Sequence, residues 1–394
     1  MTPTIARKST SVRKNVPVIP NVSAERWKEI TGKYPHFPTD ILELTSERCE
    51  APVRLPAPIE DWLARNAGLV HDPRDGIMIS LVFNITCAAG LLYALLWYYP
   101  SHWLGLFTQC FYFAVFETRF ILMKHYAEHQ RGFSTLFGWY VSGVLSTLAG
   151  LPPGLYGLHH LFMHHIGNNA VGDDLSATEC YQRDNILHWL VYCGKHYFCM
   201  ATLPMYAFSR QRPGLALASL GGTAYWVLFI RYTWSVNKHF AIWALIVPFC
   251  ALQAFLMFGN FCQHIFVHPK VGSMTDKHGY EFNCAIAYQS INHFDNLITF
   301  NDGYHVTHHV NSRVHWTRHP EHFLTNLEKY VENDTLVING LGVPEIGFYA
   351  FTGRLDIIAD HVVHFTKEKR KKEDVIADLK LRLQPIVRKS VKAI

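Results

Sequence analysis

The stretch GIMISLVFNITCAAGLLYALLWYY, Gly76–Tyr99, runs for 24 residues without a charged side chain. A helix that spans a bilayer needs about 20 apolar residues. The aromatic cluster Trp97–Tyr99 at its end is typical of anchoring at a membrane interface. Stretches of similar length and composition occur at 103–123, 214–233 and 240–261. The sequence therefore predicts an integral membrane protein with four spans.

Short connections pair these spans into two hairpins, each of which returns the chain to the side from which it came. No stretch after His264 is long enough to span a membrane. Both termini should therefore lie on one side, which we expect to be cytosolic because the terminal segments are basic. We predict an all-α membrane protein with a cytosolic helical cap. Its parts are an N-terminal extension (1–70), a membrane domain (71–325) and a C-terminal region with a basic tail (326–394).

Composition agrees with a membrane core that carries large aqueous parts. Hydrophobic residues make up 49% of the chain and charged ones 17%, yet the mean hydropathy is only +0.04. The net charge of +5 arises largely in the segments 6–15 and 367–372. Basic tails occur on nucleic-acid-binding proteins, but on a membrane protein they indicate the cytoplasmic side or simply a solvated end. We expect no nucleic-acid partner.

Weaker signals complete the predicted topology. Nine cysteines without a C-x-x-C pair indicate a reducing compartment rather than a disulfide framework. The segments Phe133–Leu151 and Asn185–Pro204 are predicted to be interfacial or partly buried helices. Pro248 is expected to kink the fourth span. Glu117 and Arg119, near the end of the second span, should face protein or a polar cavity.

Histidine is unusually frequent, and its residues gather where the spans end. Pairs four residues apart share one helix face, as in HYAEH (125–129), HLFMHH (160–165) and HVTHH (305–309). A single His264 follows the fourth span, one turn after Asn260. The predicted topology places all four groups on one side of the membrane. The candidate metal ligands are His125, His129, His160, His164, His165, His264, His305, His308 and His309.

Nine imidazoles suit two metal ions with four or five ligands each, because a tetrahedral zinc takes only four. Imidazole binds Zn, Cu, Fe and Ni, so ligand type alone does not select the metal. His159 is an alternative to His160, which we prefer because it lies four residues before His164. Other histidines are expected to lie at the surface, beside the site, or in a loop that lines it: His268, His278, His293, His315, His319 and His322.

With these three ordered histidine motifs, residues 70–325 resemble the membrane fatty-acid desaturase and hydroxylase superfamily. We call the motifs box one (125–129), box two (160–165) and box three (305–309). NFCQH (260–264) is similar to the family's N-x-x-x-H element, and a glycine and an aromatic residue precede box three, as is common in the family. The resemblance implies that the nine histidines bind two non-haem irons, and that Asn260 reaches a metal through water. Zinc can replace iron in a purified sample.

The family's chemistry is the O2-dependent oxidation of an unactivated C–H bond of a lipid, which acid–base side chains alone cannot attack. The resemblance implies a multi-pass protein of the endoplasmic reticulum that takes electrons from a separate cytochrome b5-like or ferredoxin-like protein. A basic face would suit an acidic donor, with Lys195, Arg210, Arg212 and 367–372 as candidates. No catalytic residue beyond the metal centre is predicted.

Several functions remain open at this point. Box one reads H-x-x-x-H rather than the H-x-x-x-x-H of acyl-CoA desaturases, which disfavours a CoA substrate. The leading prediction is a fatty-acyl desaturase, with a lipid hydroxylase or acetylenase as the alternative. A transition-metal transporter should carry ionisable residues at mid-span, and Gly76–Tyr99 has none. A non-catalytic scaffold is disfavoured because all nine histidines are present.

Overall fold

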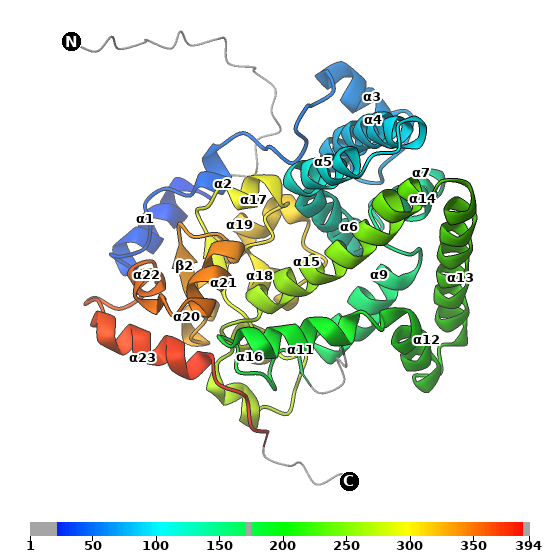
Figure 1. The fold of residues 1–394 in the computed structure, drawn as a ribbon. Coiled ribbons are helices and arrows are strands. Elements are labelled where there is room, and N and C mark those ends of the chain that lie inside the picture. The colour runs from blue at the N-terminus through cyan, green and yellow to red at the C-terminus, as the bar shows by residue number, and fades with distance from the viewer. Residues whose placement is uncertain (1–21, 171–174, 389–394) are drawn as a thin grey trace, which may run out of the picture.

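The computed structural model describes residues 22–170 and 175–388, so the basic segment 6–15 lies outside the described residues. This part of the chain is almost entirely helical, with one two-stranded sheet (Figure 1). Four of its helices are long and apolar enough to cross a membrane, at Pro73–Tyr98, His102–Gln130, Pro213–Val236 and Lys238–Gln263. The predicted fold class is confirmed.

Two spans are single helices and two change their winding on the way. The first and third are α4 (Gly76–Tyr98) and α13 (Pro213–Val236). The second consists of α5 (His102–Tyr112), the π-helix η2 (Phe113–Glu117) and α6 (Thr118–Gln130). The fourth consists of α14 (Lys238–Ala241), the π-helix η5 (Ile242–Ile246) and α15 (Val247–Gln263). The π-turn of the fourth span directly precedes Pro248, which has no N–H to continue the regular ladder.

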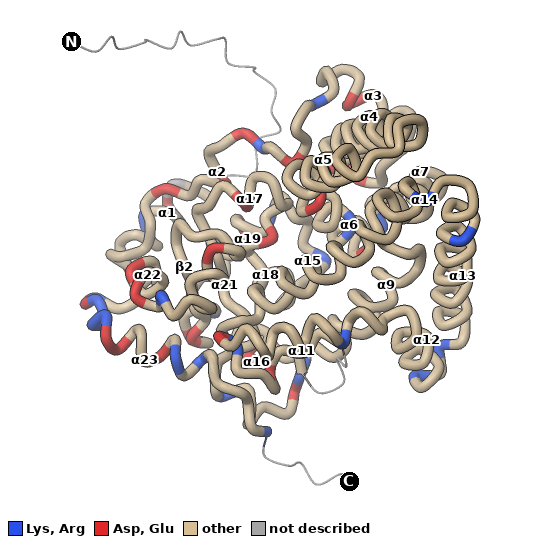
Figure 2. The backbone as a smooth tube through the Cα atoms, in the orientation of Figure 1, with Lys and Arg blue, Asp and Glu red and all other residues tan. Residues whose placement is uncertain are grey.

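Local capping fixes where the two hairpins turn. The Ser101 hydroxyl accepts a hydrogen bond from Leu104 N (3.4 Å) at the start of α5. The Asn237 side-chain oxygen accepts one from Phe240 N (3.0 Å), and its amide donates to Trp97 O (2.9 Å). The second turn is thereby tied to the end of the first span. Most charged residues lie outside the spans, and α4, α5 and α15 carry none (Figure 2).

The described helices between the two hairpins are too short to cross a membrane. They are α7 (Thr135–Trp139), the π-helix η3 (Tyr140–Leu145), α8 (Ser146–Leu148), α9 (Leu155–His159), the π-helix η4 (His160–His164), α10 (His165–Gly167), α11 (Ile186–His196) and α12 (Cys199–Ser209). In α11 the exposed side chains Leu187, Leu190 and Val191 lie opposite the buried Tyr192 and His196. This is the pattern of a helix that lies along a membrane surface.

The cap is formed by residues 22–65 and 264–388. Its helices are α1 (Ala24–Lys33), α2 (Leu42–Thr45), α3 (Ala57–Arg65), α16 (Tyr280–Ala285), α17 (Asp295–Ile298), α18 (His305–Val310), α19 (His319–Thr325), α20 (Leu327–Glu332), α21 (Val343–Phe351), α22 (Leu355–Asp360) and α23 (Lys372–Arg382). Short 3-10 turns lie at η1 (Pro73–Asp75), η6 (Pro269–Ser273) and η7 (Trp316–Arg318). Strands β1 (Gln289–Ile291) and β2 (Val337–Asn339) pair in parallel, with Ser290 opposite Ile338.

One core joins the two ends of the chain within the cap. Ile30, Tyr34 and Phe37 of the N-terminal segment pack with Phe323 and Val337. In Figure 1 the blue α1 accordingly lies beside the orange α22. The division into three parts at 70 and 325 stays a prediction, although residues from the first and last parts share this core.

One buried arginine joins the C-terminal helix to the segment that follows the fourth span. Arg183, fully buried, donates hydrogen bonds to six backbone oxygens, among them Ile265 O (2.9 Å) and Arg382 O (2.8 Å). Burial lowers the pKa of Arg183 to about 9. The residue therefore joins the end of α23 to the chain just after His264.

Candidate metal centre

Five predicted ligands from all three boxes meet in one cluster, the five-histidine cluster. Its members are His125 and His129 of α6, His160 and His165 of box two, and His308 of α18; their ligand nitrogens all lie within 4.8 Å of one another. The Nε2 of His308 lies 2.8 Å from Nε2 of His125 and 3.3 Å from that of His165. The Nε2 of His160 lies 2.9 Å from Nε2 of His129 and 3.2 Å from that of His165.

The remaining four predicted ligands form a second group, the four-histidine cluster. The ligand nitrogens of His164, His264 and His309 lie within 4.8 Å of one another. The Nε2 of His305 lies 3.0 Å from Nε2 of His264 and 3.1 Å from Nε2 of His309. The structure therefore brings all nine predicted histidines together, in groups of five and four.

These separations fit metal ions better than a hydrogen-bonded network. A neutral imidazole has one N–H, so Nε2 of His308 cannot be satisfied by two other imidazole Nε2 atoms at once. Metal–nitrogen bonds of about 2.0–2.1 Å would place neighbouring ligand nitrogens about 3 Å apart. Burial also lowers the pKa values of the cluster histidines in the cap and in box two, which keeps their lone pairs free of protons; these are His160, His165, His305, His308 and His309.

Box two reaches both clusters because it is wound as a π-helix. In η4 the backbone pairs residues five apart rather than four. His160 and His165 are therefore neighbours in the five-histidine cluster, with ring centroids 4.7 Å apart. His164 instead lies 5.3 Å from the ring of His264 in the other cluster. The preference for His160 over His159 agrees with this geometry. The rings of His160 and His164 also lie close, with centroids 5.7 Å apart, although their ligand nitrogens belong to different clusters.

Several residues that the sequence analysis missed hold the outer nitrogens of the four-histidine cluster. The Asn168 side-chain oxygen lies 2.9 Å from Nδ1 of His309. The Ser176 hydroxyl lies 3.3 Å from Nδ1 of His164, and Ile286 O lies 3.0 Å from Nδ1 of His264. Such contacts fix the ring orientation and tautomer of a ligand. The one available signal was Asn168 itself, since asparagine tolerates the left-handed conformation (φ 51°) that ends box two.

Asn260 lies beside the site rather than within either cluster. Its amide nitrogen donates to Ser176 O (3.1 Å) and to the Tyr192 hydroxyl (2.6 Å). Asn260 also lines the cavity described below. A role for Asn260 through a bound water stays a prediction.

The other histidines lie outside both clusters. The imidazole of His159 contacts the Ser176 hydroxyl (3.0 Å) and packs on His196. His319 is buried with its ring 6.0 Å from that of His308, and burial lowers its pKa to about 3. The rest have partners elsewhere or lie at the surface: His268 with Asp334, His293 with Asp295 and Glu345, His315 with Asp75, His278 exposed, and His322 in a surface pocket with Arg318.

Gly303, two residues before box three, is required by close packing. Its N–H donates to the Asn296 side chain (2.8 Å), and a Cβ at this position would collide with Ser290 O. The glycine therefore lets box three approach strand β1.

A cavity of about 240 Å³ runs from the metal centre between α6 and α15 to the cap. His125, His160, His164 and His305 contribute to its wall. Its apolar lining includes Ile121, Leu122, Phe255, Leu256, Met257 and Phe258. An apolar cavity with a few convergent polar groups is the usual form of a small-molecule site. Its lining suits an alkyl chain held beside the histidine clusters.

Comparison with known proteins agrees with this arrangement. A family model described as fatty acid desaturase matches residues 101–338, more than half of the chain. The match contains all nine clustered histidines and Asn260. No curated protein and no solved structure matches the chain.

Proposed function

The chain belongs to the fatty acid desaturase family, and on that premise we propose that it is an O2-dependent desaturase that introduces a double bond into the fatty acyl chain of a membrane lipid. The observation that carries the proposal is the pair of histidine clusters beside an apolar cavity, to whose wall four of the nine histidines contribute. A membrane oxidoreductase that acts on lipid suits both features, because its substrate is apolar and the C–H bond it attacks needs a redox metal.

We propose iron as the metal. Two irons would be held by the five-histidine and four-histidine clusters, with Asn260 facing a water on one of them. The metal pair, when bound, supplies the one-electron and O2 chemistry that amino-acid side chains lack. In the balanced reaction a CH2–CH2 unit loses two hydrogens, and O2 is reduced to two waters with two electrons and two protons from outside.

The protein's own residues bind the substrate and orient the histidine rings that would ligate the metals. The apolar wall excludes water from the acyl chain and fixes its depth relative to the clusters. Asn168, Ser176 and Ile286 O hold three ligand rings in the four-histidine cluster. Geometry of this kind positions reactants before the reaction and lowers its entropic cost.

We propose a separate acidic protein as the electron donor, docking at Arg210 and Arg212. The Arg212 guanidinium lies 5.0 Å over the ring of Phe162, inside box two, and Arg210 lies over Tyr206. The basic run 367–372 is at the start of α23, and Figure 2 shows it well apart from α12. The arginine pair is favoured over this run because Arg212 contacts Phe162, which lies in a box that supplies ligands.

Location in the endoplasmic reticulum, with the cap in the cytosol, is part of the same proposal. The reducing cytosol, in which the cap would lie, suits a chain with nine free cysteines. A cytosolic cap also gives a soluble donor access to Arg210 and Arg212. Protease protection of an epitope tag at the C-terminus in sealed microsomes tests the orientation: the tag should be cleaved without detergent.

The deciding experiment is lipid profiling of a host that expresses the chain, compared with His308→Ala. We expect a new acyl species that has lost two hydrogens and about two irons per purified chain. The variant should form no product and keep about one iron, because His308 belongs to the five-histidine cluster alone. The matched control is His278→Ala, an exposed histidine outside both clusters, which should leave product and iron unchanged. An added oxygen in the product would assign a hydroxylase, and a further loss of hydrogen an acetylenase. A lipid profile identical to that of the empty host, with no iron bound, would overturn the proposal.

A further inference from the structure

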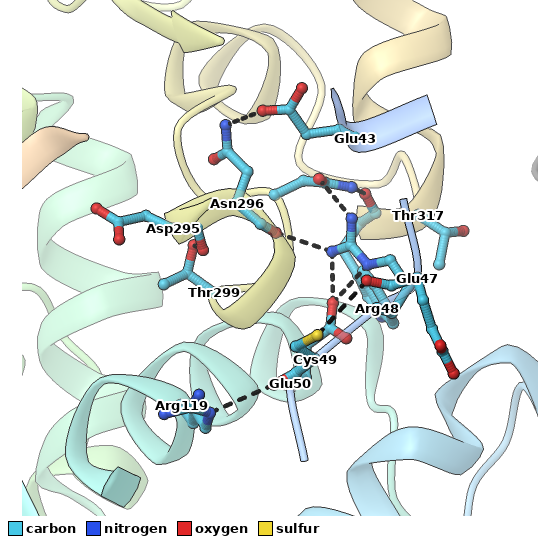
Figure 3. A network of polar contacts seen from close by, with 12 residues as sticks. Glu43, Glu47, Arg48, Cys49, Glu50, Arg119, Asp295, Asn296, Thr299 and Thr317 are labelled. Atoms are coloured by element: carbon cyan, nitrogen blue, oxygen red, sulfur yellow. Dashed lines mark hydrogen bonds and ion pairs between the residues drawn. The ribbon is translucent and has the colours of Figure 1, made fainter. Parts of the chain in front are cut away.

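Residues 42–50, which precede the region matched by the family model, pack against one wall of the cavity beside the metal centre (Figure 3). We call them the 42–50 segment. The residues that they contact, 295–303, include several that line the cavity, and we call them the wall segment. Cys49 N donates a hydrogen bond to Leu297 O (2.9 Å). A part of the chain outside the family match is therefore in direct contact with a wall of the proposed substrate site.

Glu43 of α2 binds the side chain of Asn296 in the wall segment. Glu43 is fully buried, and its Oε1 accepts a hydrogen bond from Asn296 Nδ2 (2.6 Å), as Figure 3 shows, and another from His293 N (3.1 Å). The side-chain oxygen of Asn296 in turn accepts from Gly303 N (2.8 Å). Asn296 and Gly303 both line the cavity, and Gly303 lies two residues before box three. Glu43 is thus linked by two hydrogen bonds in series to the entry of box three.

Arg48 holds the backbone of the wall segment at a second point. Its guanidinium group donates to Asn296 O (2.9 Å) and to the Asn301 side chain (2.9 Å), and it pairs with the fully buried Glu50. The same group lies 5.2 Å over the ring of Trp316. The planar fork of arginine engages several acceptors at once, which a lysine ammonium does not reproduce. Arg48 therefore fixes both ends of the turn from Asn296 to Asn301.

The 42–50 segment is also tied to the second span. Arg119 of α6 donates to Cys49 O (3.4 Å) and to Val115 O (2.6 Å) (Figure 3). Helix α6 carries box one, and the wall segment leads into box three. The 42–50 segment therefore contacts both the helix that supplies box one and the turn that precedes box three.

The contacts between the 42–50 segment and the wall are made by buried charged groups. The side chains of Glu43, Arg48 and Glu50 are 0%, 11% and 0% exposed. Buried charges carry a desolvation cost, and well-packed apolar residues often replace them without loss of stability. Apolar residues would therefore suffice to cover the wall. Hydrogen bonds are directional, so these polar partners impose one geometry on Asn296, which favours a positioning role over simple coverage.

We propose that Glu43 and Arg48 are positioning residues for the substrate cavity. Through Asn296 they fix the wall segment, and the wall segment sets the depth at which an acyl chain lies beside the histidine clusters. The inference rests on the proposed function and adds to it two residues outside the family match that govern substrate placement. Loosening the 42–50 segment should change the cavity and leave the metal centre loaded, because His264 and Asn168 contact the ligands of box three from other elements.

The first test follows the wall segment without turnover, by hydrogen–deuterium exchange of the purified full chain in detergent. Glu43→Leu keeps the approximate size of the side chain and removes the acceptor, whereas Glu43→Gln keeps an acceptor oxygen. Burial raises the pKa of Glu43, so the uncharged glutamine is a close replacement. We expect amides of 295–303 to exchange about fivefold faster in Glu43→Leu, the factor that one lost hydrogen bond typically gives. Glu43→Gln should exchange nearly as the parent does.

The matched control is Glu47→Leu, which removes an exposed carboxylate from the same segment and should leave exchange unchanged. Arg48→Lys keeps a positive charge beside Glu50 and loses the fork. It should also speed exchange in 295–303, and it decides the question if Glu43→Leu does not fold. About two metal ions should stay bound in every variant. Unchanged exchange in Glu43→Leu and Arg48→Lys, or equal exchange in Glu43→Leu and Glu43→Gln, would overturn the inference.

The second test separates KM from kcat in membranes of a host that expresses the chain, with a labelled acyl lipid as substrate. Glu43→Leu should raise KM about fivefold with a smaller change in kcat. Its product should carry double bonds at more than one position, because a looser wall admits the chain at more than one depth. Glu43→Gln should restore both properties.

The outcomes distinguish this inference from the desaturase proposal. A fall in kcat with loss of metal, an unchanged KM and a single double-bond position would show a general structural role and overturn the inference. No product from the parent or any variant, together with the expected pattern of exchange, would contradict the desaturase proposal and leave the positioning of the wall by Glu43 and Arg48 standing.

Discussion

Box one and box two have similar histidine spacings, but their histidines are distributed differently between the two clusters. His125 and His129 lie on the regular helix α6, and both enter the five-histidine cluster. In box two, His160 and His164 have the same four-residue spacing but belong to different clusters. The difference teaches that spacing predicts shared ligation only if the winding of the helix is known. The π-turn accommodates one extra residue, and box two therefore supplies ligands to both clusters.

Inserting one alanine between Phe162 and Met163 should have the largest effect, because it would shift the second half of box two by one residue relative to His160. The imidazoles of His164 and His165 would turn by about 100° relative to His160, and each cluster would lose a ligand. We expect complete loss of bound iron and product, measured by atomic emission and lipid profiling. Phe162→Leu keeps the chain length and is the control, with iron retained. An insertion variant that keeps its iron would show that the register of box two is not needed.

Paired ligand variants should separate the two boxes more finely. His125→Ala with His129→Ala removes two members of one cluster only, so the four-histidine cluster should keep its metal, about one ion per chain. His160→Ala with His164→Ala touches both clusters and should leave little or no metal. Neither pair should form product. Metal analysis of folded, monodisperse protein checks this, and equal losses in the two pairs would refute the division into five and four.

Asn168→Ala should act through the four-histidine cluster alone. The side chain holds Nδ1 of His309, and loss of such a partner typically weakens metal affinity 10–100-fold. Competition with a chelator measures this affinity. Asn168→Asp retains an acceptor oxygen and should recover most of it. If both variants bind metal as the parent does, Asn168 does not orient His309.

The neighbours His159 and His160 offer a closely matched pair. His160→Gln should abolish product, because its nitrogen lies in the five-histidine cluster. His159→Gln should keep both metals and lose product by no more than about tenfold, since His159 reaches the ligand His164 only through Ser176. Lipid profiling with metal analysis decides this, and the opposite order would reassign the ligand.

The smallest effect should come from His319, which is buried beside box one and His308. Its folded pKa is about 3, against about 6.5 in an unfolded chain. The unfolded state therefore takes up the proton first, so the stability that the neutral ring contributes is full above about pH 6.5. It is lost as pH falls, by about 1.4 kcal/mol per pH unit. His319→Phe should flatten the fall of the unfolding temperature of the metal-free protein between pH 7 and pH 5; an unchanged slope would contradict this.

Much of the fold followed from local pattern. Three predicted spans lie within the helices observed at His102–Gln130, Pro213–Val236 and Lys238–Gln263, and the first exceeds its helix, Pro73–Tyr98, by Tyr99 alone. The agreement is close because length and the absence of charge are properties of short segments. The predicted helical segment Asn185–Pro204 is observed as two helices, α11 and the first part of α12, with a break at Tyr197–Phe198. The convergence of the boxes followed from topology, since two hairpins return every box to one side of the membrane.

The sequence by itself determined the spans, the side on which the boxes gather and the nine imidazoles available there. Tertiary structure decided how they divide, because the choice between α- and π-winding at His160–His164 depends on packing rather than on local spacing. Tertiary structure also decided that Asn168 and Ser176 contact the ligand rings of His309 and His164. Both residues lie in loops, and sequence periodicity does not predict where a loop packs. The cavity is of the same kind, because its wall combines residues of α6, α15 and the cap that are far apart in the sequence.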